Sequence, residues 1–275
     1  MVEKKFMNDM LIVLKEQVKN LGMIFRVSKY EERAMYQSHY LGVLWQVLNP
    51  IIQVGIYYLI FGLGFYGGRE VEGAPFIVWM MIGLSVWLFM YSAILGTSNS
   101  IVNKMFLITK MNFPVSVLPA VNIASNLTSF YAMFGVTVVV ALSQHVFITI
   151  KWIQFIYFFI CMIAFLVSIG IFSATMTVLI RDYHMILQSL MRVLLYLSGV
   201  IWNIKDANFP AAFKAVLELN PIFYIIDGFR TSLLNGQWFW QDYQHMVFFW
   251  GLTLLIFLVG SHLHVKFRAR FVDLS

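Results

Sequence analysis

Residues Trp152–Ile180 read WIQFIYFFICMIAFLVSIGIFSATMTVLI, a stretch without one charged side chain. A helix of about 20 apolar residues is long enough to cross the hydrocarbon core of a bilayer. Further uncharged stretches of that length or more are Ala34–Gly68, Gly73–Asn103, Met111–Ile150 and Tyr243–Val265. We therefore expect an integral membrane protein.

The composition leads to the same expectation. The 275 residues are 60% hydrophobic and 12% charged, whereas a soluble domain has about 25% charged residues. This excludes a water-soluble globular protein. The single Cys161 excludes a disulfide within one chain and a cysteine-ligated metal cluster, and its apolar surroundings favour a packing role.

The apolar pattern predicts one all-α polytopic domain over residues 1–275, with six membrane-spanning helices. We place these helices at Leu41–Leu63, Phe76–Leu95, Val117–Leu142, Trp152–Ile180, Leu187–Trp202 and Met246–Val265. The fifth contains Arg192. An arginine costs about 2.5–3.5 kcal/mol at the centre of a bilayer, so we expect this side chain near a helix end or facing protein.

The distribution of lysine and arginine indicates the orientation. Six spans place both termini on one side, which then holds 14 of the 19 Lys and Arg residues. Positive residues collect on the cytoplasmic side of a membrane. We therefore expect a multi-pass protein of the plasma membrane with both termini in the cytoplasm. The net charge of +6 follows from this bias, so no nucleic-acid partner is predicted.

The amino-terminal segment, residues 1–33, predicts an amphipathic helix at the cytoplasmic face. Its apolar residues recur at steps of three and four, at Phe6, Met10, Leu14, Val18, Leu21 and Phe25. A helix with such a stripe and a basic polar face lies in the plane of the lipid head groups. Packing on a soluble partner is the alternative.

The connection at residues 204–243 is long and too apolar for a simple loop. It predicts two helices, Phe209–Leu219 and Ile222–Leu234, that are too short to cross a bilayer and are separated at Pro221. Re-entrant helices at the outer face, buried against protein, fit this pattern. Side chains with the spacing of helical ion pairs, which can either pair or be solvated, are Lys214 with Glu218 and Asp227 with Arg230.

On the inner face, Asn103–Pro114 reads NKMFLITKMNFP and mixes two lysines with apolar side chains. This mixture is typical of a short amphipathic helix. Such a helix can bind a soluble partner or rest on anionic lipid.

Several kinds of chemistry lack their sequence signatures. There is no G-x-x-x-x-G-K-[ST] loop, so ATP energy has to come from another polypeptide. The expected spans contain no Asp or Glu, which disfavours ion-coupled transport. The six histidines have no metal-ligand spacing, and no catalytic set can be assembled. We therefore expect no metal site, no cofactor and no enzymatic activity in this chain.

Four short motifs carry a family resemblance that covers essentially the whole chain. They are Tyr40–Pro50 (YLGVLWQVLNP), Lys110–Pro119 (KMNFPVSVLP), Arg181-Asp182 and Leu219-Asn220-Pro221. In this order they resemble the permease subunits of ABC-2 type polysaccharide exporters. The nearest resemblance is to wall teichoic acid export permeases, followed by O-antigen and capsule export permeases. Val115 departs from the pattern, since many relatives have a basic residue there.

The resemblance implies an assembly and a cargo. Two copies of the chain would form a homodimer with two copies of a separate ATPase subunit, which binds ATP and Mg²⁺. The complex would export a polysaccharide carried on undecaprenyl pyrophosphate, most closely wall teichoic acid. A conduit between two protomers fits a sugar-phosphate chain better than one inside a six-helix bundle.

The resemblance also implies three groups of site residues. Those coupling to the ATPase are Asn103, Lys104, Met105, Phe106, Leu107, Lys110, Met111, Arg181 and Asp182. Those at the conduit or substrate are Arg33, Trp45, Asn49, Pro50, Tyr57 and Tyr58. Those at an outer gate are Asn220, Pro221, Asp227 and Arg230.

Two alternatives remain open at this point. One is an ABC-2 permease for a different cargo, such as O-antigen, a capsule polymer, a small drug or a lipid. The other is a membrane enzyme or assembly scaffold that handles lipid-linked sugar without moving it.

Overall fold

The chain is almost entirely helical, which confirms the all-α fold class. The computed structural model describes residues 2–36, 40–65, 70–106, 113–205 and 210–271. Its helices are α1 (Val2–Lys19), α2 (Leu21–Tyr36), α3 (Trp45–Tyr57), α4 (Phe76–Ser98), α6 (Leu118–Ser143), α7 (Gln154–Leu179), α8 (Tyr183–Leu197), α9 (Ala211–Glu218), α10 (Pro221–Leu233) and α11 (Tyr243–Phe267). A small antiparallel hairpin pairs β1 (Glu70–Val71) with β2 (Ala74–Pro75).

Short turns of other helix types extend several of these elements. A π-helical turn, η2 (Tyr58–Phe65), continues α3. The 3-10 turns are η1 (Gly42–Leu44), η3 (Val102–Lys104), η4 (Val115–Val117), η5 (Ile150–Ile153) and η6 (Arg268–Arg270). Of these turns, η2, η4 and η5 lengthen long apolar segments beyond their α-helical cores.

Within the described residues, five helical segments are long and apolar enough to cross a membrane. They are Trp45–Gly64, Phe76–Ser98, Val115–Ser143, Ile150–Leu179 and Tyr243–Phe267. The expected fifth span at Leu187–Trp202 instead coincides with α8, which begins and ends earlier and has 15 residues. At 1.5 Å per residue that is about 22 Å, short of the roughly 30 Å of a hydrocarbon core. A sixth crossing at this place stays a prediction.

Helix α4 forms the centre of the bundle. In the most apolar 18-residue stretch of α4, 78% of the residues are buried. The helix packs against α6, α7 and α10. A helix that is apolar on every side belongs in such a position. The opposite case is Trp45–Gly64, where only 11% of the corresponding stretch is buried within the protomer. The first span therefore has a broad apolar face open to lipid or to another protein.

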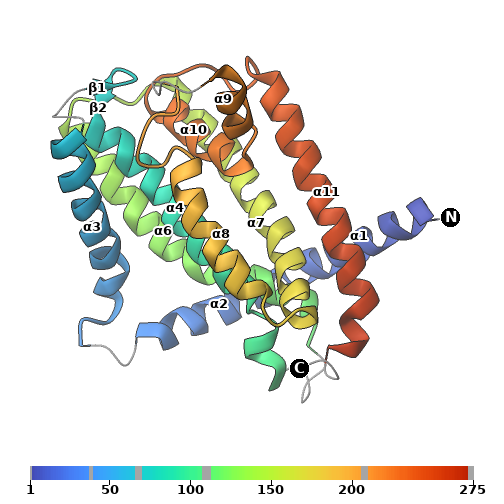
Figure 1. The fold of residues 1–275 in the computed structure, drawn as a ribbon. Coiled ribbons are helices and arrows are strands. Elements are labelled where there is room, and N and C mark those ends of the chain that lie inside the picture. The colour runs from blue at the N-terminus through green and yellow to red at the C-terminus, as the bar shows by residue number, and fades with distance from the viewer. Residues whose placement is uncertain (1, 37–39, 66–69, 107–112, 206–209, 272–275) are drawn as a thin grey trace.

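The amino-terminal segment forms two helices, where the sequence predicted one. Figure 1 shows α1 and α2 running crosswise to the spans at the base of the bundle. They are separated at Asn20, whose side chain donates to the Glu16 carbonyl oxygen at 2.7 Å. Helix α1 packs on α11, and α2 packs on α6.

The predicted apolar stripe of this segment is largely exposed. Leu14, Val18, Leu21 and Phe25 are 39–66% exposed. The buried side of α1 instead includes polar Asp9 and Gln17. Gln17 donates to the Ser116 carbonyl oxygen at 2.6 Å, and the Asp9 carboxylate lies 2.7 Å from His262 Nδ1 of α11. Polar contacts, together with the buried Val13 and Ile24, thus hold the segment to the bundle and leave much of its predicted apolar stripe facing outward.

The bounds of α9 and α10 are close to those of the two short outer helices that the sequence predicted. Asn220 caps α10, because its side-chain oxygen accepts a hydrogen bond from the Ile222 N–H at 3.0 Å. Pro221 occupies the first turn, where a missing N–H costs nothing. Helix α10 is mostly buried and packs against α4 and α7. Its placement within a membrane stays a prediction.

Candidate functional site: a cavity between spans and an outer polar network

A cavity of about 700 Å³ lies between the first span and the helices α4, α6 and α8. Of the predicted conduit residues, Trp45, Asn49, Pro50 and Tyr57 line it. Two others lie elsewhere among the described residues: Arg33 is exposed on α2, and Tyr58 packs against the hydrophobic core. The structure therefore brings four of the six together.

The lining of this cavity is polar and aromatic. Its polar side chains are Gln46, Asn49, Gln53, Ser85, Ser92, Asn126, Ser129 and Arg192, and its aromatic ones are Trp45, Tyr57, Trp87, Phe89, Tyr91, Phe130 and Tyr196. Of the described residues that line the cavity, Arg192 alone is charged. Amide and hydroxyl groups beside ring faces can bind sugars by hydrogen bonds and stacking.

The spacing of three amides in the first span is a sequence signal for this lining, although only one of them, Asn49, was among the predicted conduit residues. Gln46, Asn49 and Gln53 are three and four residues apart, which places them on one helix face. Amides in an apolar helix favour a face directed at protein or water. Arg192 lines the cavity from α8 and is exposed within the protomer, so its expected avoidance of lipid stays a prediction.

The described members of the predicted ATPase-coupling group lie just after the carboxyl end of α4 and at the start of α8. Lys104 ends η3 and forms an ion pair with Glu31 of α2, and Phe106 is 66% exposed. Arg181 and Asp182 are exposed between α7 and α8. A hydrogen bond of 2.7 Å between Ser98 and His184 joins these two places. The predicted residues Leu107, Lys110 and Met111 lie outside the described residues.

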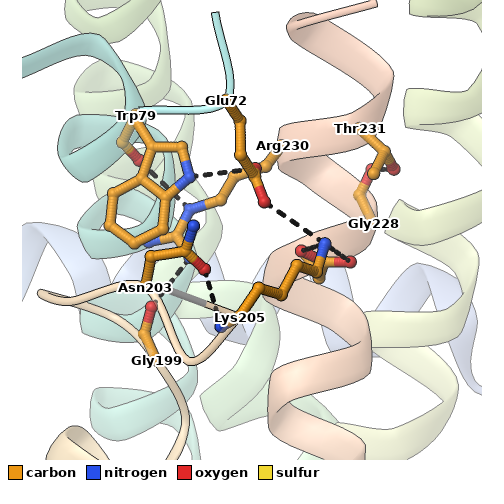
Figure 2. Close-up of polar contacts among 9 residues, drawn as sticks. Glu72, Trp79, Gly199, Asn203, Lys205, Gly228, Arg230 and Thr231 are labelled. Atoms are coloured by element: carbon orange, nitrogen blue, oxygen red, sulfur yellow. Dashed lines mark hydrogen bonds and ion pairs between the residues drawn. The ribbon is translucent and has the colours of Figure 1, made fainter. Parts of the chain in front are cut away.

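Arg230 is the centre of a polar network (Figure 2) at the end of the bundle that holds α9, α10 and the β1–β2 hairpin, which the sequence predicts to be the outer end. Its side chain is 1% exposed. It donates to the carbonyl oxygens of Trp79 at 3.2 Å, Gly199 at 2.7 Å and Val200 at 2.7 Å. Its guanidinium carbon also lies 3.3 Å from the centroid of the Trp79 ring. The arginine thus joins α10 to the start of α4 and to the end of α8.

Asp227 forms its ion pair with Lys205, at 3.1 Å. Lys205 also pairs with Glu72 of the hairpin turn at 3.3 Å, and Glu72 accepts a hydrogen bond from Trp79 Nε1 at 3.1 Å. Burial lowers the pKa of Lys205, but the two carboxylates outweigh burial and raise it above its ordinary value. Burial raises the pKa of Asp227, and Lys205 opposes that rise.

The helical ion pairs considered from the sequence are therefore replaced by contacts across the fold. Lys214 donates to the Lys205 carbonyl oxygen at 2.9 Å, while Arg230 donates to backbone and Asp227 pairs with Lys205. These contacts join α9 and α10 to the segment that follows α8. In the part of the chain that the structure describes, no group of three or more His, Cys, Asp or Glu side chains is arranged to hold a metal ion.

Comparison with known proteins agrees with this architecture. Residues 24–234 match the family model described as ABC-2 type transporter. The O-antigen export system permease protein RfbA of Myxococcus xanthus is 23% identical over 264 residues, which cover 96% of this chain and 99% of that protein. A protein of the same name from Klebsiella pneumoniae is 25% identical over 260 residues, covering 93% of this chain and 97% of the relative. This chain belongs to the ABC-2 type transporter family, as a multi-pass membrane permease.

Proposed function

We propose that this chain is the membrane subunit of an ATP-driven exporter that moves a lipid-linked polysaccharide from the cytoplasmic to the outer face of the plasma membrane. The observation that carries the proposal is the cavity between α3, α4, α6 and α8, with its amide, hydroxyl and aromatic lining. The names of the relatives, which are O-antigen export permeases, support the same class of cargo.

The cavity is incomplete within one protomer. It borders the first span, which has 11% of its most apolar stretch buried, and α8, whose Leu190, Val193 and Tyr196 are more than half exposed. Exposed apolar faces beside a polar cavity favour closure by a second copy of the same surface. We propose a homodimer that encloses the conduit, driven by two copies of an ATPase subunit that binds ATP and Mg²⁺.

The lining also bears on the cargo. One arginine among uncharged side chains suits a mainly neutral glycan better than a polymer with a phosphate in every repeat. O-antigen-type polysaccharide on undecaprenyl pyrophosphate is therefore our first proposal. Wall teichoic acid, which the sequence motifs imply, is the second.

The test is to block the cavity in a bacterial strain that lacks its own permease and carries the ATPase partner. Ser92 is exposed and lines the cavity, so Ser92→Trp fills part of its volume. We expect surface polymer, measured with a labelled lectin or antiserum, to fall about tenfold, the equivalent of 1.4 kcal/mol.

Ser143→Trp is the matched control. Ser143 is exposed at the far end of α6 and is not part of the cavity lining. Equal export by both variants, at equal amounts of permease in the membrane, would show that the cavity is not the conduit. Parallel strains deficient in O-antigen export or in teichoic acid export distinguish the two cargoes.

A further inference from the structure

We propose that Glu31 and Glu32, adjacent in α2, are paired positioning residues. They connect the docking segment, residues 103–106 of the predicted ATPase-coupling group, to the wall of the cavity. The inference rests on the proposed function, because it assigns a role to residues between the predicted coupling segment and the proposed conduit. It concerns regulation of the cavity by movement on the cytoplasmic side.

Glu31 faces the docking segment. Its carboxylate forms an ion pair with Lys104, and the two side chains are 23% and 18% exposed. A pair this shielded is screened less by solvent and salt than an exposed one. Lys104 lies two residues before Phe106, which presents an apolar ring at the same surface, 66% exposed. Displacement of the docking segment therefore pulls on α2 through this ion pair.

Glu32 faces the cavity wall. One carboxylate oxygen accepts a hydrogen bond from Gln46 Nε2 at 3.1 Å, and the other accepts one from Thr128 Oγ1 at 3.0 Å. Gln46 belongs to the first span, is 3% exposed and lines the cavity. Both oxygens of this one carboxylate thus hold side chains of the two helices, α3 and α6, that form part of the conduit.

Helix α2 connects the two carboxylates rigidly. The residues are neighbours on one helix, which packs through Ile24 against Val117 of η4 and Val121 of α6. A rotation or shift of α2 driven at Glu31 moves Glu32 with it. Gln46 and Val54 are the residues of α3 described as buried, so Glu32 contacts one of the two side chains by which this helix is buried in the protomer.

The first experiment measures polymer exported per ATP hydrolysed by the full permease–ATPase complex in vesicles. Glu31→Gln or Lys104→Gln should each lower this ratio about threefold, within the usual range of coupling effects. The charge-reversed pair Glu31→Lys with Lys104→Glu should restore at least half of the loss. A merely structural role for the pair would lower the amount of folded complex, and with it export and ATP hydrolysis together, so their ratio would not change.

Glu16→Gln is the matched control. Glu16 is a partly buried glutamate of α1 that pairs with Arg268 at 3.0 Å and accepts a hydrogen bond from Ser116. It makes no described contact with the cavity, so the export-to-ATP ratio should stay at the wild-type value. An equal fall in Glu16→Gln and Glu31→Gln, or no rescue by charge reversal, overturns the inference.

A second experiment uses the permease alone, so that failure of the proposed function can be recognised separately. Asn49→Cys introduces a thiol in the cavity. The native Cys161 is fully buried and should not react with the label. Glu32→Gln should change the rate of labelling by a water-soluble maleimide about threefold, whereas Glu16→Gln should not.

The outcomes of the two experiments separate the two proposals. If the wild-type complex exports no polysaccharide while Glu32→Gln still alters labelling, the cargo assignment fails and the mechanical link stands. If labelling is unchanged by Glu32→Gln, the link between α2 and the cavity is wrong, whatever the complex transports.

Discussion

Replacing Arg230 with Met removes the centre of the outer network and leaves a side chain of similar length. The three hydrogen bonds from the guanidinium to carbonyl oxygens contribute about 1.5 kcal/mol each, as bonds from a charged donor do. The contact with the Trp79 ring contributes about 2 kcal/mol when shielded from water. Several kcal/mol are offset by the cost of burying the arginine charge. We therefore expect a net loss of about 3 kcal/mol in the free energy of unfolding.

The assay is thermal unfolding of the purified permease in detergent, followed by loss of the monodisperse protein. A loss of about 3 kcal/mol corresponds to a fall of roughly 6–12 °C in Tm for a chain of this size. Arg230→Lys retains the charge without the planar fork, so we expect about half of the fall. Arg26→Met, on the exposed surface of α2, is the control and should change Tm by about 1 °C or less.

An independent variant tests the same geometry from the other side. A Cβ at Gly83 would lie 2.2 Å from Arg230 Nη2, so Gly83→Ala has to displace the guanidinium. If Arg230→Met unfolds within about 1 °C of the wild type, the network does not stabilise the outer face, and the reasoning is refuted.

Three further predictions follow from contacts described above. Phe106→Asp should lower co-purification of the ATPase subunit about tenfold by placing a charge in an apolar contact. Phe147→Asp, at a ring 72% exposed between α6 and η5, should not lower it. Asn220→Ala should lower the free energy of unfolding by about 1 kcal/mol or more, because the α10 cap and the hydrogen bond to Ser198 are lost. Pro221→Ala should lower it less, and thermal unfolding of the two variants checks which is the less stable. The pKa of Lys205 is raised in the folded protein, so its stabilising contribution is complete below its ordinary pKa of 10.5 and is lost as pH rises through the raised value. Above about pH 10, the Tm of the wild type should therefore fall more steeply with pH than the Tm of Lys205→Met.

The positions of the long spans could be predicted because bilayer thickness and apolar length are linked by helix geometry alone. Phe76–Ser98 and Ile150–Leu179 both lie within a few residues of the predicted ranges. The short outer helices could be predicted equally well, since a proline at the first turn of α10 is a local signal. The boundaries of α8 were harder to predict, because its apolar pattern continues past Leu197 while the helix itself ends there.

The contacts of the site depend on tertiary placement and could not be predicted from spacing. Asp227 and Arg230 have the spacing of a helical pair, but Lys205 and the carbonyl oxygens of Gly199 and Val200 are nearby in the fold. Loop carbonyls carry no signature in the side-chain sequence. The polar face of the first span, in contrast, could have been identified from the spacing of its amides.

The contact between Asp9 and His262 has a consequence for biosynthesis. The two residues are 253 positions apart, so this contact of α1 cannot form until the last span has been made, whereas Gln17 can already bind the Ser116 carbonyl oxygen. At a synthesis rate of about 5–20 residues per second, Asp9 waits roughly 13–50 seconds for its partner. During that interval the Asp9 carboxylate lacks the histidine beside which it is buried in the finished protein. Completion of the carboxyl-terminal helix and docking of the Asp9 end of α1 are therefore a single late event, and a chain shortened before His262 should leave that end undocked.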